Sequence, residues 1–304
     1  MIYTLTFNPS IDYLVFTNQV QLGTLNRTKD EKITFGGKGL NVSYMLNQLG
    51  TKNIALGFLA GFTGYEIKRQ LDDLNINNDF IFLKEGNSRI NIKLNDLKET
   101  EINGNGPIIS KEGIDELYQK LDCIKEDDYL ILAGSVQNSV PNTIYGDLMN
   151  YLKDRKVNFV IDADKGLLSE ALIYQPFLIK PNLEELKMTL NMRINCNDDI
   201  IMGAKILKEK GAKNVLVSLG KDGAILIDEN DNIYTQKTIS SKVVKTVGSG
   251  DSMLAGFISN YLKNKDYYQA LIFSVACGSA SAFSKGLASK ESIGQVYQKL
   301  LLNS

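Results

Sequence analysis

The chain of 304 residues contains no histidine. This absence excludes Ser-His-Asp hydrolases, HExxH metalloproteases and every metal site that depends on imidazole. A general base acting near neutral pH must therefore be a carboxylate, a lysine, a tyrosine or a cysteine. A carboxylate that acts on an alcohol substrate is a common solution, provided that the transition state is otherwise well stabilised.

Cysteines and long apolar runs are also scarce. Cys123, Cys196 and Cys277 are far apart and form no CxxC pair, so we expect reduced thiols in a cytoplasmic protein and neither a disulfide scaffold nor a zinc site. No stretch reaches the ~18 apolar residues of a membrane span. The N-terminal segment lacks the basic and apolar regions of a signal peptide. We therefore expect no membrane association.

Charge of one sign does not dominate. The formal net charge is -1, with basic and acidic residues interleaved, so no basic stripe predicts nucleic-acid binding. An anionic ligand must be held by local groups, because the field of the whole molecule is weak. Hydrophobic residues make up 43% of the chain, which is typical of a globular protein with a sizeable core.

Strand-like and helix-like segments alternate along most of the chain. Short apolar runs such as residues 129–135 and 158–164 are typical of buried parallel strands, and residues 40–50 have the spacing of a helix. This alternation predicts an α/β fold with a doubly wound, mostly parallel sheet and helices on both faces. Linkers, repeats and low-complexity tracts are absent, so we expect a single domain over residues 1–304.

Two segments break the alternation. Residues 11–16 and 89–103 read as strands with no helix between them, and the second predicts a hairpin that turns at Asn95–Lys98. Polar and apolar residues alternate along its first strand, which indicates a two-faced strand. We expect strands from about 11–36 and 88–106 to form a small β-sheet lid apart from the main sheet.

A glycine turn followed by a carboxylate stands in the sequence TVGSGDSMLAGF. Gly248 and Gly250 free the backbone to point successive N–H groups into one concavity. A helix that starts near Asp251 adds its positive N-terminal end, which makes an anion hole suited to a phosphoryl group in transfer. Asp251 can then accept a proton from an attacking hydroxyl. In the alternative, a strand–turn–helix junction, Asp251 is only the N-cap.

A second glycine cluster lies in TFGGKGLNVS. Lys38 is flanked by glycines, including Gly37, and Asn41 follows in the first helical turn. Such a lysine can lie against a small polar ligand or its phosphate, and Asn41 can bind sugar hydroxyls. The alternative is a flexible helix entry with an exposed lysine. Three glycines among four residues cost backbone entropy, so we favour the functional interpretation.

Asp12 and Arg89 are further candidates. Asp12 follows the first predicted strand, and the carboxyl ends of strands face the crevice of an open α/β sheet. A carboxylate there can bind two sugar hydroxyls. Arg89 begins the hairpin strand and can hold a phosphate through paired hydrogen bonds. The alternative for Asp12 is a surface aspartate in a turn after Pro9, and the alternative for Arg89 is a solvent-facing arginine. Each alternative is favoured as much as the functional interpretation of the same residue.

Two more motifs have a structural and a functional interpretation each. Asn182 and Glu185 match a capping box, but they can also lie near nucleotide phosphates and hold Mg²⁺ partly through water. The sequence VSLGKDG predicts a hairpin turn, or alternatively a nucleotide pocket shaped by Ser218 and Gly220.

The motifs together resemble the ribokinase-like carbohydrate kinases of the PfkB family over nearly the whole chain. They are, in order, TFNPSIDY, GGKGLNVS, RINIKL, AGSV, KPNLEE, VSLGKDG and TVGSGDSMLAGF. GxxxxGK[ST] and GxGxxG are absent, which disfavours a Walker A site and a dinucleotide-dependent oxidoreductase. The resemblance implies ATP-dependent phosphorylation of a sugar phosphate. Fructose 1-phosphate is the first expectation, tagatose 6-phosphate is the rival, and a non-catalytic sugar or nucleotide sensor is the third alternative.

The resemblance also implies roles for individual residues. Asp251 is the catalytic base, beside an anion hole formed by Gly248, Ser249 and Gly250. The substrate-binding residues are Asp12, Gly37, Lys38, Asn41, Arg89, Gly134 and Ser135, with Lys38 and Arg89 meeting the existing phosphate. The nucleotide is bound by Asn182, Ser218, Gly220, Gly223 and the anion-hole residues Gly248, Ser249 and Gly250, and Glu185 serves Mg²⁺. ATP and Mg²⁺ are implied, K⁺ is a further candidate, and the lid implies a homodimer.

Two positions depart from the family pattern. Ser249 stands where alanine is usual, which preserves the backbone N–H of the anion hole. Gln137 stands in GSVQNS where many relatives have proline, which predicts a looser substrate loop.

Overall fold

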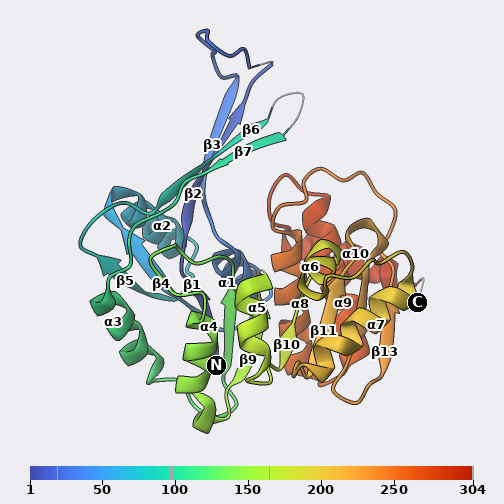
Figure 1. Ribbon diagram of the computed structural model, residues 1–304. Coiled ribbons are helices and arrows are strands. Elements are labelled where there is room, and N and C mark those ends of the chain that lie inside the picture. Colours follow the sequence, from blue (N-terminus) through green and yellow to red (C-terminus); the bar gives the residue numbers. More distant parts are fainter. Residues whose placement is uncertain (19, 96–98, 164, 303–304) are drawn as a thin grey trace.

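The computed structural model describes residues 1–18, 20–95, 99–163 and 165–302, and a nine-stranded sheet forms its centre (Figure 1). In spatial order its strands are β13 (Ile233–Gln236), β12 (Ala224–Ile227), β11 (Asn214–Ser218), β10 (Leu178–Ile179), β9 (Asn158–Asp162), β8 (Tyr129–Ala133), β1 (Ile2–Thr6), β4 (Asn53–Ala60) and β5 (Asn78–Leu83). All neighbours from β11 to β5 pair in parallel, and only the β11–β12 and β12–β13 pairs are antiparallel. The predicted mostly parallel sheet is confirmed.

Helices cover both faces of this sheet (Figure 1). They are α1 (Lys38–Gln48), α2 (Gly61–Asp73), α3 (Lys111–Leu121), α4 (Ile144–Tyr151), α5 (Lys165–Leu172), α6 (Leu183–Leu190), α7 (Asn197–Glu209), α8 (Ser249–Asn264), α9 (Tyr267–Ala282) and α10 (Lys290–Leu301). Among the described residues, no helix is both long and apolar enough to cross a membrane.

The strand β8 explains why central strands read as continuous apolar runs. Leu130 and Leu132 point into a core built with α3 to α7, whereas Tyr129 and Ile131 point into a second core with α1 and α8 to α10. Because successive side chains of a strand alternate between faces, a strand covered on both faces must be apolar at every position.

A second sheet projects from the main body (Figure 1). We call it the lid sheet, and its strands in order are β3 (Asp30–Gly36), β2 (Ser10–Phe16), β6 (Arg89–Asn95) and β7 (Glu99–Asn103). The predicted small sheet is confirmed. Within the turn predicted at Asn95–Lys98, residues 96–98 lie outside the described part of the chain.

Candidate active site

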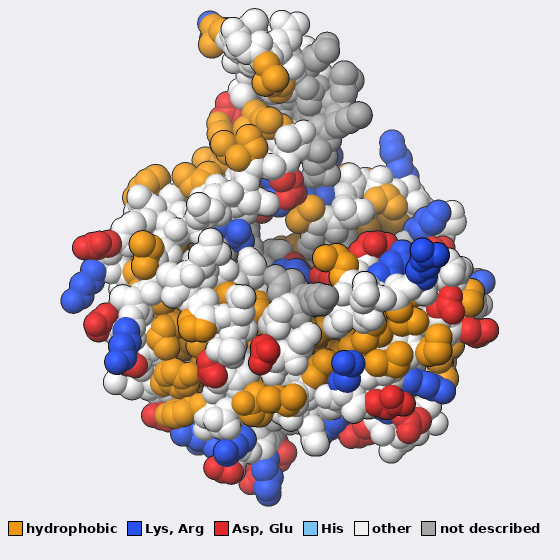
Figure 2. Space-filling model, viewed as in Figure 1, with side chains coloured by type: hydrophobic (Ala, Val, Ile, Leu, Met, Phe, Trp, Pro, Cys, Tyr) orange, Lys and Arg blue, Asp and Glu red, His pale blue; other side chains and the backbone are white. Residues whose placement is uncertain are grey.

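A cavity of about 1140 Å³ lies between the lid sheet and the main body, and Figure 2 shows the hollow with charged side chains around it. The lid sheet, the carboxyl ends of β9 to β11 and the N-termini of α1 and α8 all contribute to its lining. The sequence-predicted residues that line it are Asp12, Gly37, Lys38, Asn41, Arg89, Asn182, Glu185, Ser218, Gly220, Gly223, Gly248, Ser249, Gly250 and Asp251. Parallel strands present their carboxyl ends at one edge, which explains this convergence.

Gly134 and Ser135 are the predicted residues that this lining does not include. Gly134 has a φ of 96° and lies against the side chain of Lys38, because a Cβ built on it meets the Lys38 Cβ at 3.6 Å. Ser135 is exposed. The AGSV loop therefore supports the Lys38 side of the cavity.

Asp251 is the third residue of α8 and not its N-cap. The N-cap is Gly248, whose φ of 84° is in the left-handed region that glycine adopts readily. No strand precedes the turn within the fully described segment 237–247, so the strand–turn–helix alternative is wrong. The Asp251 carboxylate is buried and its Oδ2 accepts a hydrogen bond of 2.7 Å from the Asn41 side chain.

The environment of Asp251 raises the pKa of its carboxyl group to about 6. Burial is the largest cause, and the nearby Asp162 carboxylate acts in the same direction. The hydrogen bond from Asn41 and the charges of Lys38 and Lys180 oppose the rise. The group is therefore ionised at neutral pH yet more basic than an ordinary aspartate, which suits a general base.

The turn before α8 differs in one donor from the predicted anion hole. The Ser249 N–H is already used, because it donates to the carbonyl of Thr246 at 3.1 Å. Among the described residues, the N–H groups of Gly250 and Asp251 have no protein acceptor. Such free donors at a helix N-terminus attract anions. A Cβ at Gly250 would lie 3.2 Å from the Lys180 ammonium, so glycine lets this cation approach the turn.

Asp162 and Lys180 are functional candidates that the motif reading missed. Asp162 ends β9 and is almost fully buried, at 1% exposure, and it pairs with Lys38 at 2.9 Å and with Lys180 at 3.0 Å. Burial tends to raise the pKa of Asp162, but Lys180 and Lys38 outweigh it and hold the pKa below its ordinary value. The sequence signal that could have indicated them is a charged residue at the end of a buried parallel strand, because such ends face the crevice of the sheet.

Lys38 begins α1 and belongs to this charged cluster. Its ammonium lies 2.9 Å from Asp162 and 3.7 Å from the Glu185 carboxylate. Burial alone lowers the pKa of Lys38, but Asp162 and Glu185 outweigh it, so the pKa lies above its usual value. The Lys38 side chain is 38% exposed, but these ion pairs hold it in place, so the flexible helix entry is the wrong interpretation.

Asn182 and Glu185 form the predicted capping box at the start of α6. The Asn182 side chain accepts from the Glu185 N–H, and Glu185 Oε2 accepts from the Asn182 N–H, both at 2.8 Å. Among the described residues, no group of three His, Cys, Asp or Glu can hold a metal. The Glu185 carboxylate beside the Lys38 ammonium does fit Mg²⁺, which is usually held by few carboxylates, water and substrate phosphates.

Asp12 lies inside β2 of the lid sheet and not at the carboxyl end of β1. It is buried and accepts hydrogen bonds from Ser10 Oγ at 2.8 Å and Asn91 Nδ2 at 3.0 Å. The interpretation as a surface aspartate is wrong.

Arg89 enters the same side of the cavity and is half-buried. Its Nε donates to the carbonyl of Asn8 at 3.1 Å. Burial lowers the pKa of Arg89 and the Asp12 charge opposes this, but a guanidinium remains charged in proteins. The solvent-facing alternative is therefore wrong.

Gln137 lies in the loop that follows β8. It is buried, and its Nε2 donates to the carbonyl of Phe7 at 2.9 Å. This bond ties the loop to the end of β1, so the predicted loosening is wrong.

The sequence VSLGKDG adopts the predicted turn between β11 and β12. Gly220 and Gly223 both have positive φ, and a Cβ at Gly223 would lie 1.9 Å from the Gln236 carbonyl. Ser218 pairs with Asn182 through an isolated bridge, which brings the two motifs together. The hairpin turn is confirmed, and the nucleotide pocket stays a prediction, although Ser218, Gly220 and Gly223 all line the cavity.

Comparisons with known proteins agree on one family. The family described as "pfkB family carbohydrate kinase" matches residues 5–293. A 1-phosphofructokinase of Bacillus subtilis is 38% identical, with 97% of each chain covered. A D-tagatose-1-phosphate kinase of Bacillus licheniformis is also 38% identical, over 99% of this chain and 98% of that protein.

The fold comparison agrees with the sequence comparison. The crystal structure of phosphofructokinase-2 from Escherichia coli in complex with substrates and products has a TM-score of 0.94 at 27% identity, with 99% of each chain covered. The chain therefore belongs to the pfkB family of carbohydrate kinases and is a phosphotransferase.

Proposed function

We propose that the chain transfers the terminal phosphoryl group of ATP to the C6 hydroxyl of fructose 1-phosphate, giving fructose 1,6-bisphosphate and ADP. The observation that carries the proposal is Asp251, a buried carboxylate whose pKa is raised to about 6 beside the free N–H groups of α8. A sugar or nucleotide sensor has no need of such a base.

Asp251 accepts the proton of the sugar hydroxyl as the new O–P bond forms and the bond from the terminal phosphorus to the bridging oxygen of ATP breaks. The bond from Asn41 holds Oδ2, which leaves Oδ1 for the proton. The Gly250 and Asp251 N–H groups, together with Lys38 and Lys180, stabilise the phosphoryl oxygens. Phosphoryl transfer depends mainly on this positioning and charge neutralisation.

The acceptor lies against the lid sheet in this proposal. Arg89 binds its existing phosphate, and Asp12 accepts hydrogen bonds from ring hydroxyls. Lys38 is assigned to the transferred phosphoryl group and not to the acceptor phosphate, because its partners Asp162 and Glu185 lie at the carboxyl end of the main sheet.

Mg²⁺ completes the proposed site. Glu185 would hold it, partly through water, and the bound ion would neutralise charge on the phosphate oxygens. K⁺ stays a prediction, checked by comparing rates in potassium and sodium buffers. A cytoplasmic location, where ATP and Mg²⁺ are abundant, is part of the proposal.

D-Tagatose 1-phosphate is the second candidate acceptor, because a kinase for that sugar is as similar in sequence as the 1-phosphofructokinase. An ADP-release assay with fructose 1-phosphate, tagatose 1-phosphate, tagatose 6-phosphate and fructose 6-phosphate tests the proposal. We expect the highest kcat/KM for fructose 1-phosphate. A higher value for any of the other three would overturn this choice.

We further propose a homodimer formed through the lid sheet, whose strands lie within a single kinase domain. Its outer face exposes Ile33, Ile90 and Ile102 at 55%, 43% and 57%, and hydrophobic side chains are visible along the projecting sheet in Figure 2. Burial of this face in a second copy removes apolar surface from water. Sedimentation should give a dimer that Ile90→Lys converts to a monomer; an unchanged mass would contradict the interface.

A further inference from the structure

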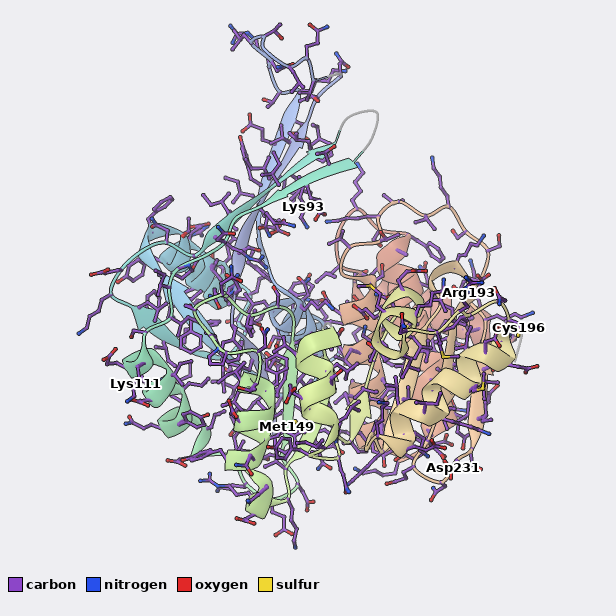
Figure 3. All side chains as sticks on the ribbon, viewed as in Figure 1. Lys93, Lys111, Met149, Arg193, Cys196 and Asp231 are labelled. Carbon is purple, nitrogen blue, oxygen red and sulfur yellow. The ribbon has the colours of Figure 1, made fainter. Side chains whose placement is uncertain are left out.

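The cavity-facing side of the lid sheet contains a buried lysine. Lys93, in β6, lies in register beside Leu14 of β2 and opposite Glu101 of β7. Its side chain is only 5% exposed, and its Nζ lies 2.8 Å from Asp12 Oδ2 and 3.8 Å from Glu101 Oε1. Figure 3 labels Lys93 on the projecting sheet. Lysine is rarely buried unless its charge is paired. The ion pair with Asp12 therefore allows Lys93 to lie buried in the lid sheet.

The Asp12 carboxylate is held from several directions. Ser10 Oγ and Asn91 Nδ2 donate to Oδ1, and Lys93 binds Oδ2. A Cβ at Gly36 would lie 2.5 Å from Oδ1, so the glycine leaves room for the carboxylate. In the described chain, Lys93 is the one protein partner of Asp12 Oδ2. This oxygen can therefore accept a further hydrogen bond from a ligand in the cavity that Asp12 lines.

Asn91 supplies a second acceptor next to Asp12. Its side chain is 6% exposed and lines the cavity. Its amide nitrogen is used by Asp12, but its Oδ1 is buried and has no hydrogen-bond partner among the described residues. Buried polar atoms are normally paired, and an unpaired one calls for an explanation such as a ligand.

We propose that Lys93 is a positioning residue that determines acceptor specificity. By fixing Asp12 beside Asn91, it creates two rigid acceptors that read neighbouring ring hydroxyls of a ketohexose phosphate. This inference rests on the proposed function.

The chemistry of the two candidate acceptors makes this arrangement selective. Fructose and tagatose differ only in the direction of the C4 hydroxyl. Rigid acceptors match the C4 hydroxyl of one epimer, whereas the other epimer leaves a buried polar group unpaired. A site built on hydrogen bonds therefore rejects the second epimer strongly. A mobile Asp12 accommodates both epimers.

Lys93→Met tests the role directly. We expect kcat/KM for fructose 1-phosphate to fall about 10- to 100-fold, the range for hydrogen bonds to a charged group. The loss should appear mainly in KM for the sugar, with KM for ATP unchanged. The ratio of kcat/KM for fructose 1-phosphate to that for tagatose 1-phosphate should move toward one. Lys29→Met, at an exposed lysine before β3, is the matched control and should leave the ratio unchanged.

A double-mutant cycle with Asp12→Asn shows whether Lys93 acts through Asp12. If Lys93 acts through Asp12, the double variant Asp12→Asn/Lys93→Met loses no more kcat/KM for fructose 1-phosphate than Asp12→Asn alone. Fully additive losses would mean direct contact of Lys93 with the sugar and would overturn the positioning role. If Lys93→Met does not fold, the neutral Lys93→Gln is read in the same way, and an unchanged epimer ratio in a folded variant overturns the proposal.

The outcome separates this inference from the proposed function. If the wild-type protein phosphorylates neither ketohexose 1-phosphate, the proposed function fails. If the wild type is active and Lys93→Met keeps the wild-type epimer ratio, only the role of Lys93 fails. Calorimetric titration of fructose 1-phosphate without ATP gives a readout besides activity, and Lys93→Met should weaken binding by a similar factor.

Discussion

We expect Asp251→Asn to lower kcat and at the same time to raise the stability of the protein. The Asp251 carboxylate is buried, and its pKa is raised to about 6. The charge that destabilises the folded state is the same charge that accepts the proton of the substrate. Asparagine keeps the shape of the side chain and a partner for Asn41, but it removes the charge.

The magnitude of the stability gain follows from the pKa. The pKa rises from 3.8 to about 6, and because one pKa unit corresponds to about 1.4 kcal/mol, the ionised carboxylate costs the folded state on the order of 3 kcal/mol. The net pKa already contains the attraction of Lys38 and Lys180. A chain of this size gains about 2 °C in Tm for each kcal/mol, so we expect a rise of several degrees.

The dependence of this gain on pH has a definite sign. The folded-state pKa of Asp251 lies above the unfolded value, so the folded state binds the proton more tightly. The destabilisation therefore begins as pH rises through the unfolded pKa and is complete above the folded pKa near 6. Melting curves should show a large gain for Asp251→Asn at about pH 8 and a small one at about pH 4.

Kinetics test the same group. We expect kcat of Asp251→Asn to fall about 10²- to 10⁴-fold, the usual contribution of a positioned base, with KM for both substrates little changed. In the wild type, kcat/KM should decline as pH falls through about 6, where Asp251 becomes protonated. Asp154→Asn, at an exposed position, is the control. A variant kcat within about threefold of the wild type, well short of the loss expected for a base, or a Tm gain independent of pH, would refute the reasoning.

Three further predictions concern residues around this base. Arg89→Ala should raise KM for the sugar phosphate far more than KM for ATP, because Arg89 lies on the lid side of the cavity; equal changes in steady-state kinetics would contradict its role. Asp162→Asn leaves Lys38 and Lys180 without their shared counter-ion and should lower stability by about 3–5 kcal/mol in denaturant unfolding; no loss would mean that the lysines find other partners. Gln137→Leu leaves the buried Phe7 carbonyl unpaired and should destabilise by about 1–3 kcal/mol; a melting curve equal to that of the wild type would show the bond to be dispensable.

Local sequence patterns predicted the elements better than the contacts between them. Apolar runs such as residues 129–135 fell on buried parallel strands, because a strand covered on both faces admits few polar residues. The Asn182–Glu185 capping box was predictable because its two hydrogen bonds join residues within one helical turn. Asp12 was assigned both to the end of the first strand and to the predicted lid strand over residues 11–16, and the structure supports the second assignment, because Asp12 lies in β2.

The sequence by itself determined the kind of chemistry. Without histidine, a base near neutral pH has to come from another side chain, and the glycine turn before Asp251 places a carboxylate at a helix N-terminus. These are local properties of composition and backbone freedom, so they are readable before the chain folds.

Only the tertiary structure decided how the charges are arranged. Asn41 and Asp251 are 210 residues apart in the sequence, and Lys38 and Asp162 are 124 apart, yet each pair is within hydrogen-bond distance. The parallel sheet collects the carboxyl ends of distant strands, and burial there strengthens every electrostatic interaction. The raised pKa of Asp251 and the pairing of Lys93 with Asp12 depend on that packing, which no local motif encodes.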